Sequence, residues 1–169
     1  MPEPTPRSLF PQAVAAFLAL PTVVGGLVPW LLVRFDRARR PGAPIGWILL
    51  AVGVLVLGSC VQEFYRAGRG TLAPWRPPIH LVTSGLYRVS RNPMYVGVLA
   101  IVIGWALATG STRVGWYVLI LAVAFHLRVR LSEEPTLARS FPSEWQAYTK
   151  RVARWLPWRL ERRGTEPPG

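Results

Sequence analysis

The side chains that could do chemistry gather in two short polar stretches. The first, residues 80–95, has the sequence HLVTSGLYRVSRNPMY, and the second, residues 128–134, has the sequence RVRLSEE. The second stretch ends in two adjacent carboxylates, Glu133 and Glu134, which follow two arginines. Such charges at a membrane face are costly unless they bind a ligand or one another. A ligand bound there would be expected to carry both signs of charge.

A zwitterionic cofactor such as S-adenosylmethionine has this character. Its ammonium and sulfonium groups suit a carboxylate and aromatic faces, and its carboxylate suits an arginine or the N–H groups at a helix start. The dipeptide Asn92-Pro93 predicts such a helix start, because proline lacks the N–H that would go unpaired in the first turn.

Other familiar sites are missing from the sequence. It contains no glycine-rich dinucleotide loop after a strand, no P-loop and no His or Cys pair at metal-ligand spacing. We therefore expect no metal site and no Rossmann-type methyltransferase fold. The single cysteine, Cys60, lies in an apolar run and is expected to be a small buried hydrophobic residue.

The composition favours a membrane over nucleic acid as the partner of the basic charge. Twenty Lys and Arg against eight Asp and Glu give a net charge of +12, yet 51% of the residues are hydrophobic. The charges lie in short blocks between long apolar runs, which is the arrangement of a membrane protein with basic loops near anionic lipid. We expect membrane lipids and no nucleic acid among its partners.

Four apolar segments are predicted to be helices, at residues 13–33, 45–61 (or 45–65), 95–109 and 114–127. The first has about the length needed to cross ~30 Å of hydrocarbon, and its prolines and glycines predict a kink. The last two contain only ~15 apolar residues each, roughly 22 Å of helix. They can still span if flanking residues extend the helix and the bilayer thins locally.

The last two segments are predicted to form an antiparallel hairpin around the tight turn 110–113. Its open end carries most of the arginines, so the positive-inside rule makes that end cytoplasmic. The loop 34–44 is also strongly basic and falls on the opposite side if the second segment spans once. Either the rule is overridden there, or one of the first two segments is re-entrant. We favour four spans with both termini cytoplasmic.

Two further helices are expected after the hairpin. Ser132 is predicted to cap the first, which would open with the acids and Pro135, and Ser143 with Gln146 form a capping box for the second. On the second helix, Trp145, Tyr148 and Val152 share one face. Its basic residues, Lys150, Arg151 and Arg154, are expected to reach lipid phosphates from an amphipathic helix at the membrane surface.

The sequence thus predicts an all-α, polytopic membrane helical bundle of about four transmembrane helices with cytoplasmic C-terminal amphipathic helices. Its expected parts are an N-terminal tail (1–12), two transmembrane helices (13–65), a catalytic core (66–158) and a disordered tail (159–169). We expect a multi-pass protein of a bacterial-type plasma membrane, with its active site facing the cytoplasm.

A family resemblance sharpens this interpretation. The segment LVTSGLYRVSRNPMYVG, followed about 40 residues later by the Glu pair, an aromatic helix and RVARWLP, is similar to the isoprenylcysteine carboxyl methyltransferase and phospholipid N-methyltransferase superfamily. The family signature is GxYxxxRHPxY joined to a downstream EE, and the resemblance covers about residues 68–158. Asn92 stands where many relatives carry His, so a positioning role survives but a titrating role does not.

The resemblance implies an S-adenosylmethionine pocket and assigns residues to it. The implied cofactor-binding residues are Ile79, His80, Leu81, Val82, Tyr87, Asn92, Pro93, Met94, Tyr95 and Glu133. The candidate catalytic residues are Glu134, Arg130 and Arg91. Glu134 would serve as a base for an amine acceptor. The position that matches a substrate-side arginine of the family is Val129, with Arg128 and Arg130 on either side.

The resulting hypothesis is S-adenosylmethionine-dependent methylation of a lipophilic acceptor, either a lipid amine or a carboxylate. One alternative is an NADPH-dependent membrane reductase of the steroid 5α-reductase type, which the short chain and the Asn-Pro-Met-Tyr turn disfavour. Another is a non-catalytic lipid-binding membrane protein, which would not explain arginines and glutamates clustered at one foot of the hairpin.

Overall fold

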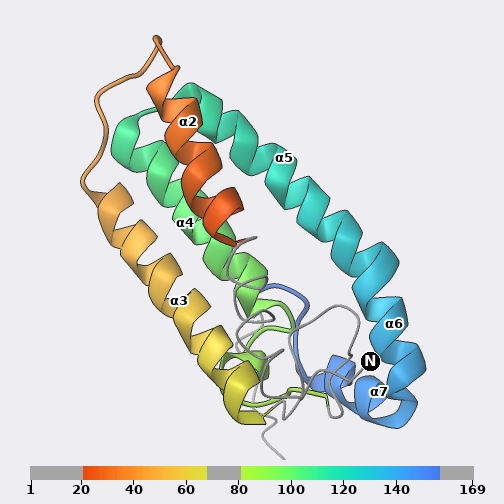
Figure 1. Cartoon of the computed structure of the whole chain (residues 1–169). Helices are drawn as coiled ribbons and strands as arrows, with labels where there is room; N and C mark the ends of the chain where they lie inside the picture. Colours follow the sequence, from red (N-terminus) through yellow and green to blue (C-terminus); the bar gives the residue numbers. More distant parts are fainter. Residues whose placement is uncertain (1–20, 68–80, 157–169) are drawn as a thin grey trace, which may run out of the picture.

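Helices make up all the regular elements of the part of the chain that the structure describes. This computed structural model describes residues 21–67 and 81–156 (Figure 1). The elements in order are a π-helical turn (Val23–Leu27), α2 (Val28–Arg34), α3 (Ile45–Ala67), a 3₁₀ turn (Gly85–Arg88), α4 (Pro93–Thr109), α5 (Thr112–Arg128), a second π-helical turn (Val129–Glu133), α6 (Glu134–Ser140) and α7 (Pro142–Arg151). The all-helical prediction is confirmed for these ranges. The predicted tails 1–12 and 159–169, and also Ile79 and His80, lie outside the described residues.

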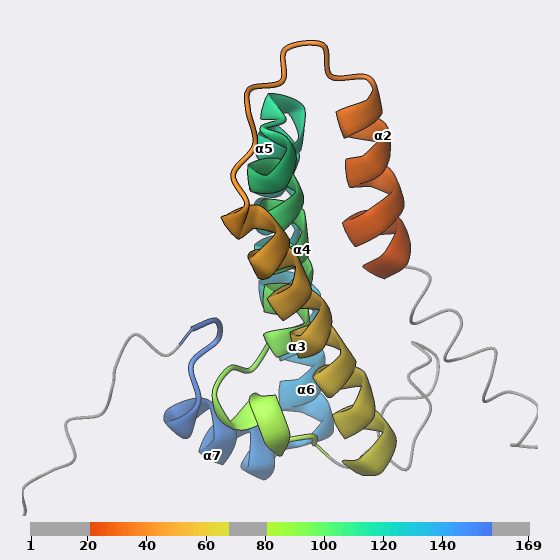
Figure 2. The ribbon, with the colours of Figure 1, turned by 90° about the vertical axis from the view of Figure 1, so that its left-hand side faces the viewer.

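The helices α2 to α5 run alternately up and down, so the bundle has two distinct ends (Figures 1 and 2). The loop end holds residues 34–44 beside the α4–α5 turn, joined by hydrogen bonds from Arg40 N to Gly110 O (3.1 Å) and from Ala43 N to Leu107 O (2.8 Å). The polar end holds residues 81–95 and 128–156. The basic loop 34–44 therefore lies at the end opposite to the predicted site, as a single crossing by the second segment requires.

The helices α3 and α4 pack against each other through facing glycines. A Cβ atom added to Gly46 would lie 2.2 Å from the backbone N of Ala108, and one added to Gly104 would lie 2.6 Å from the backbone N of Leu50. Small residues let two helix backbones approach closely, which is the packing mode favoured where lipid removes the hydrophobic drive for association. This glycine-mediated contact fixes the position of α3 along α4, and so the position of the start of α4 at the polar end.

Large apolar side chains face outward on the bundle. Trp116, Ile120 and Val123 on α5 are 65%, 66% and 59% exposed, and Leu55 on α3 is 69% exposed. A soluble bundle would bury such a stripe. The distribution fits helices whose outer faces contact lipid.

Within residues 21–67 and 81–156, two helical stretches are long and apolar enough to cross a membrane. They are residues Ile45–Glu63 and Thr112–Ser140, and only 17% of each apolar window is buried within the protein, which is unlike the core helix of a soluble protein. The other two apolar helices, Val23–Arg34 and Pro93–Thr109, are shorter. The expected four spans thus correspond to two candidate spans and two shorter helices.

The predicted helix start at Ser132 is wrong. Ser132 lies inside the π-helical turn Val129–Glu133, and the helix runs without a break from α5 into α6. Pro135 cannot donate an N–H to the carbonyl of Leu131, and a widened turn just before the proline accommodates that loss. The same arrangement recurs where the π turn Val23–Leu27 precedes Pro29, so the first helix adapts to its proline in the region where a kink was predicted.

The predicted capping box of the last helix is also wrong. The N-cap residue is Phe141, and no side chain caps the helix there. Pro142 occupies the first turn and starts α7 before Ser143, because its fixed φ angle suits that position. The predicted common face is confirmed for Tyr148, which is buried, and Trp145, which is partly buried and contacts it. Val152 is also buried, but it lies just after the helix in an extended conformation.

A buried carboxylate joins the loop 34–44 to the α4–α5 turn. The side chain of Asp36 is 2% exposed. It accepts hydrogen bonds from Ser111 Oγ at 2.5 Å, Arg113 N at 3.2 Å and Ala38 N at 3.0 Å. An acid at the N-terminus of α5 is favourable, and the Ser111 hydrogen bond is the main reason why the pKa of Asp36 lies below its ordinary value.

We predict that Gly53→Ala destabilises the bundle. Its Cβ would lie 2.7 Å from the backbone O of Gly97 and 2.7 Å from the backbone N of Ile101, so α3 and α4 would have to separate. Overpacking of this kind costs about 1–3 kcal/mol. A lower melting temperature of the detergent-solubilised variant would show it. The matched control is Gly58→Ala on the same helix, where a Cβ meets no atom within 4 Å; equal melting temperatures for the two variants would contradict the packing account.

Replacement of Asp36 by Asn should lower the melting temperature at pH 7 and have less effect in acid. A carboxylate whose pKa falls on folding stabilises the folded state above its ordinary pKa, which is 3.8 here. That contribution is lost as the pH falls through the lower folded value. The gap between wild type and Asp36→Asn should therefore narrow below about pH 3.8. A gap that stays constant between pH 7 and pH 3 would exclude this role.

Candidate functional site

The start of α4 carries the first polar stretch against the end of the α5–α6 helix. Asn92 is the N-cap residue of α4 and Pro93 lies in its first turn, as predicted. The same turn projects Tyr95 across the hairpin, where its hydroxyl donates a hydrogen bond to the Glu133 carboxylate and its ring contacts Phe125 with centroids 4.5 Å apart. The predicted meeting of the two polar stretches is thus confirmed.

Glu133 forms a small cluster with Tyr95 and Arg128, here called the Glu133 cluster. Arg128 Nε donates to Glu133 Oε1 at 2.9 Å and to the Tyr95 hydroxyl oxygen at 3.1 Å. Both hydrogen bonds to the carboxylate use Oε1, and Oε2 takes none from the residues that the structure describes. The Glu133 side chain is 32% exposed. One carboxylate oxygen is therefore placed to accept from a cationic group that approaches from outside.

Glu134 is held by two guanidinium groups. Arg91 Nη1 donates to Oε1 at 2.8 Å, while Arg154 donates to both oxygens, from Nε at 2.8 Å and from Nη2 at 2.7 Å. The guanidinium of Arg91 also lies over the ring of Trp145, 5.7 Å from its centre. Because these donors already occupy both carboxylate oxygens, the Glu134 carboxylate is positioned to hold the arginines in place.

Residues 152–155, which follow α7, form a strap across the first polar stretch. Arg91 N donates to Ala153 O at 2.9 Å, and the carbonyl of Arg154 accepts from Asn92 Nδ2 at 3.0 Å. Ser90 and Ala153 pair as an isolated parallel bridge. The Asn92 amide thus has a positioning role that needs no titration.

Sequence reasoning placed Arg154 wrongly, at the lipid phosphates. The structure turns its side chain inward onto Glu134, while Lys150 and Arg151 stay exposed. The strap changes direction after α7 ends at Arg151, and helical periodicity could not reveal that turn. The one available signal in the sequence was Glu134 itself, because a carboxylate at a membrane face needs a cationic partner.

Three of the predicted cofactor-binding residues pack into an apolar cluster. Val82 and Tyr87 are buried beside Cys60 of α3, and Met94 packs against them. This confirms the expected burial of Cys60. The side chains of these three predicted residues therefore pack the polar end against α3.

Two tyrosines at the polar end keep their protons at neutral pH. Burial raises the pKa of Tyr87 far above its ordinary value and raises the pKa of Tyr148 to about 12. The Tyr148 hydroxyl donates to the Tyr87 carbonyl at 2.7 Å, which ties α7 to the 3₁₀ turn. Both are placed as hydrogen-bonding and packing groups, since neither can readily lose its proton.

Other residues near this end, including the predicted Arg130, lie outside the Glu133 cluster. Arg130 is exposed, and it forms no ion pair or hydrogen bond with a described side chain. Val129, at the position of the family's substrate-side arginine, is fully buried, and its neighbour Arg128 takes the place beside Glu133. His126 stacks on Trp155, with ring centroids 6.1 Å apart.

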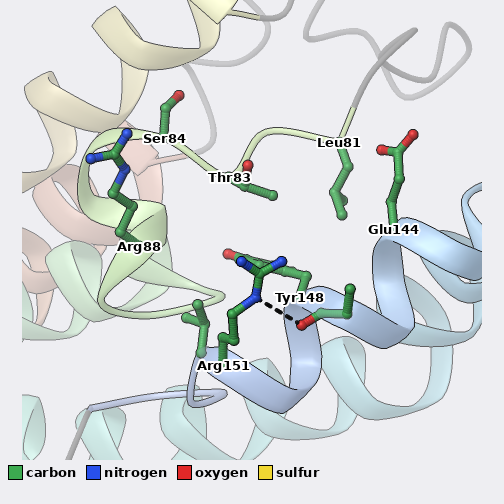
Figure 3. A pocket seen from close by; sticks show the side chains of 9 residues that line it. Leu81, Thr83, Ser84, Arg88, Glu144, Tyr148 and Arg151 are labelled. Atoms are coloured by element: carbon green, nitrogen blue, oxygen red, sulfur yellow. Dashed lines mark hydrogen bonds between the residues drawn. The ribbon is translucent and has the colours of Figure 1, made fainter.

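A hollow of about 590 Å³ lies between the 81–88 segment and α7 (Figure 3). Of the predicted cofactor-binding residues that are described, Leu81 lines it, whereas Glu133 and Tyr95 do not. The polar end therefore offers two separate features, the Glu133 cluster and this hollow.

The fold and the polar end together define an all-helical protein with outward-facing apolar helices and an arginine–glutamate centre at one end. Residues 43–144 match the family of phospholipid methyltransferases, and the chain belongs to this family. The match includes the start of α4, Glu133 and Glu134. Together with the family, the two candidate spans indicate association with a membrane.

Two curated relatives are metal resistance proteins. The chain is 31% identical over 131 residues to the cobalt-zinc-cadmium resistance protein CzcN of Cupriavidus metallidurans, covering 73% of this chain and 56% of that protein. It is 33% identical over 117 residues to the nickel-cobalt-cadmium resistance protein NccN of Alcaligenes xylosoxydans, covering 66% of this chain and 52% of that protein. The chain thus spans about half the length of these relatives. No solved structure matches it.

Loss of the strap contact should destabilise the polar end. Arg154→Gln would remove the paired hydrogen bonds to Glu134, and hydrogen bonds to charged groups contribute about 1.5–3 kcal/mol. We expect the melting temperature in detergent to fall by roughly 5 °C. Lys150→Gln, an exposed change on α7, should leave it unchanged. If both variants have the melting temperature of the wild type, the strap does not stabilise the polar end.

Proposed function

We propose that the chain is an S-adenosylmethionine-dependent methyltransferase that acts on a lipophilic acceptor, a lipid amine or carboxylate. The observation that carries the proposal is the Glu133 cluster, which presents a partly exposed carboxylate beside aromatic rings. Membership of the phospholipid methyltransferase family supports methyl transfer as the reaction class.

The donor set at the polar end fits the charges of this cofactor. Glu133 Oε2 can accept from an ammonium group, because the cluster uses only Oε1. The paired rings of Tyr95 and Phe125 lie next to that carboxylate and offer the faces that attract a sulfonium or ammonium cation. The cofactor supplies a methyl group already activated on sulfur, so the chain has to align the reacting groups and exclude water.

The structure suggests a different role for Glu134 from the one predicted. Because two arginines occupy its oxygens, we assign Glu134 and Arg91 to positioning. They hold the start of α4 against α6, which keeps Glu133 and Tyr95 in register. An acceptor that must lose a proton would then release it to water or to another group.

A lipophilic acceptor can approach the polar end from the surrounding apolar surface. Leu131 and Leu127 are 71% and 47% exposed on the helix that carries the glutamates. We propose that all four helices cross the bilayer and that the polar end is cytoplasmic, where the Lys and Arg of the C-terminal half would face anionic lipid. The cofactor would then enter from water and the acceptor from the side.

The names of the relatives raise metal binding as another activity. Within residues 21–67 and 81–156, no group of three or more His, Cys, Asp or Glu is placed to hold a metal ion. No observation on the described residues favours direct metal binding, so it does not form part of the proposal.

Calorimetric titration of the detergent-purified chain tests the proposal. The wild type should bind S-adenosylhomocysteine. Glu133→Gln should lower the affinity for this ligand at least tenfold, which is the loss expected for a hydrogen bond to a charged group. The matched control is Glu144→Gln on α7, away from the cluster, which should bind as the wild type does. Binding of NADPH alone would indicate a reductase, and binding of neither ligand would indicate a non-catalytic lipid-binding protein.

A further inference from the structure

The turn Val129–Glu133 gives the glutamates of the polar end an unusual helical register. At its end Glu134 N donates to Val129 O, five residues earlier, and α5 continues through the turn into α6 without a break (Figure 1). In an α-helix the same N–H would bond to the carbonyl four residues earlier. The turn therefore contains one residue more than an α-helical turn, and π turns of this kind are frequent at functional sites.

The contacts of Glu133 need this extra residue. Arg128 Nε donates to Glu133 Oε1 at 2.9 Å, although the two residues are five apart in the sequence. Side chains that meet on an α-helix are three or four residues apart, whereas residues five apart lie about 140° from each other around its axis. The π turn brings Arg128 and Glu133 onto one side of the helix, where the Tyr95 hydroxyl contacts both.

Glu134 depends on the same register. Val129 is fully buried, so it marks the side of the helix that faces the bundle. Glu134 is again five residues further on, and an α-helical turn would direct its side chain about 140° away from that side. In the structure Glu134 instead pairs with Arg91 and Arg154, and only 15% of its side chain is exposed. Both glutamates therefore reach their partners because the turn is π-helical.

A proline follows each of the two π turns in the described part of the chain. Pro29 lies two residues after Val23–Leu27, and Pro135 lies two residues after Val129–Glu133. In both cases the residue just before the proline donates to the carbonyl five residues earlier. A proline has no N–H, and in an α-helix its ring would clash with the carbonyl four residues earlier. The wider π turn relieves that clash, so the proline accounts for the turn.

We infer that Pro135 is a positioning residue of the polar end. By keeping the turn in the π form, it directs Glu133 toward Tyr95 and Glu134 toward the arginines. The ring of Pro135 carries no polar group, so it acts through the two carboxylates and not on a ligand. The consequence for binding rests on the proposed function, because it requires that Glu133 Oε2 holds the ammonium group of the cofactor. The consequence for the helix register does not.

The variant Pro135→Ala tests this role. Its new N–H can bond to Leu131 O, so the turn should relax to an α-helix and rotate the residues after it by one position, about 100°. Binding of S-adenosylhomocysteine to the full chain in detergent, measured by calorimetric titration, should weaken about tenfold, as expected when a hydrogen bond to a charged group is lost. Deletion of Leu131, an exposed residue of the turn, from this variant should restore the affinity, because Arg128 and Glu133 would then be four residues apart.

The matched control is Pro29→Ala, which replaces the proline after the other π turn and should leave ligand binding unchanged. A proline that mattered only for overall packing would not be compensated by removal of a residue from the turn. The inference is overturned if Pro135→Ala binds the ligand like the wild type, or if deletion of Leu131 does not restore binding.

A second measurement separates this inference from the proposed function. Arg154→Gln should lower the melting temperature of the wild type but not that of Pro135→Ala, in which Glu134 has already turned away from the strap. An equal decrease in both backgrounds would overturn the inference. If the wild type itself does not bind S-adenosylhomocysteine, the proposed function fails, and the comparison of melting temperatures still decides whether Pro135 sets the register.

Discussion

The polar end depends on one carboxylate, Glu134, on which three separate parts of the chain converge. Arg91 comes from the segment just before α4, Arg154 from the strap, and Glu134 itself from α6. Removing charges from water costs several kcal/mol per ion unless hydrogen bonds satisfy them, and here three donors meet two carboxylate oxygens. The pairing fixes the preceding residue, Glu133, against Tyr95, and it anchors the strap after α7, so that α7 forms the second wall of the hollow.

The rest of the bundle supplies a rigid frame for that centre. The glycines of α3 and α4 bring the two backbones into direct contact, and Asp36 secures the loop end through Ser111. Apolar side chains on the outer faces leave the polar groups confined to the two ends. The described arginine–glutamate contacts that bring separate segments together lie at the polar end.

Local sequence signals predicted the features that are decided locally. The helix start at Asn92, the tight turn at Gly110 and the meeting of Tyr95 with Glu133 follow from proline position, glycine and hairpin geometry. The capping predictions at Ser132 and Ser143 failed because helix continuity and Pro142 outweighed side-chain caps. The inward turn of Arg154 and the burial of Val82 and Tyr87 could not be predicted, since they depend on how the strap and α3 pack against residues far away in the sequence.

The most direct test of the account is photochemical crosslinking of labelled S-adenosylmethionine to the purified chain, followed by peptide mapping. The account predicts that the label is found in peptides from residues 81–95 and 128–140, and that excess unlabelled S-adenosylhomocysteine prevents its incorporation. Label confined to the loop 34–44 or to α3, or incorporation that the competitor does not reduce, would contradict the conclusion that the arginine–glutamate end is a cofactor site.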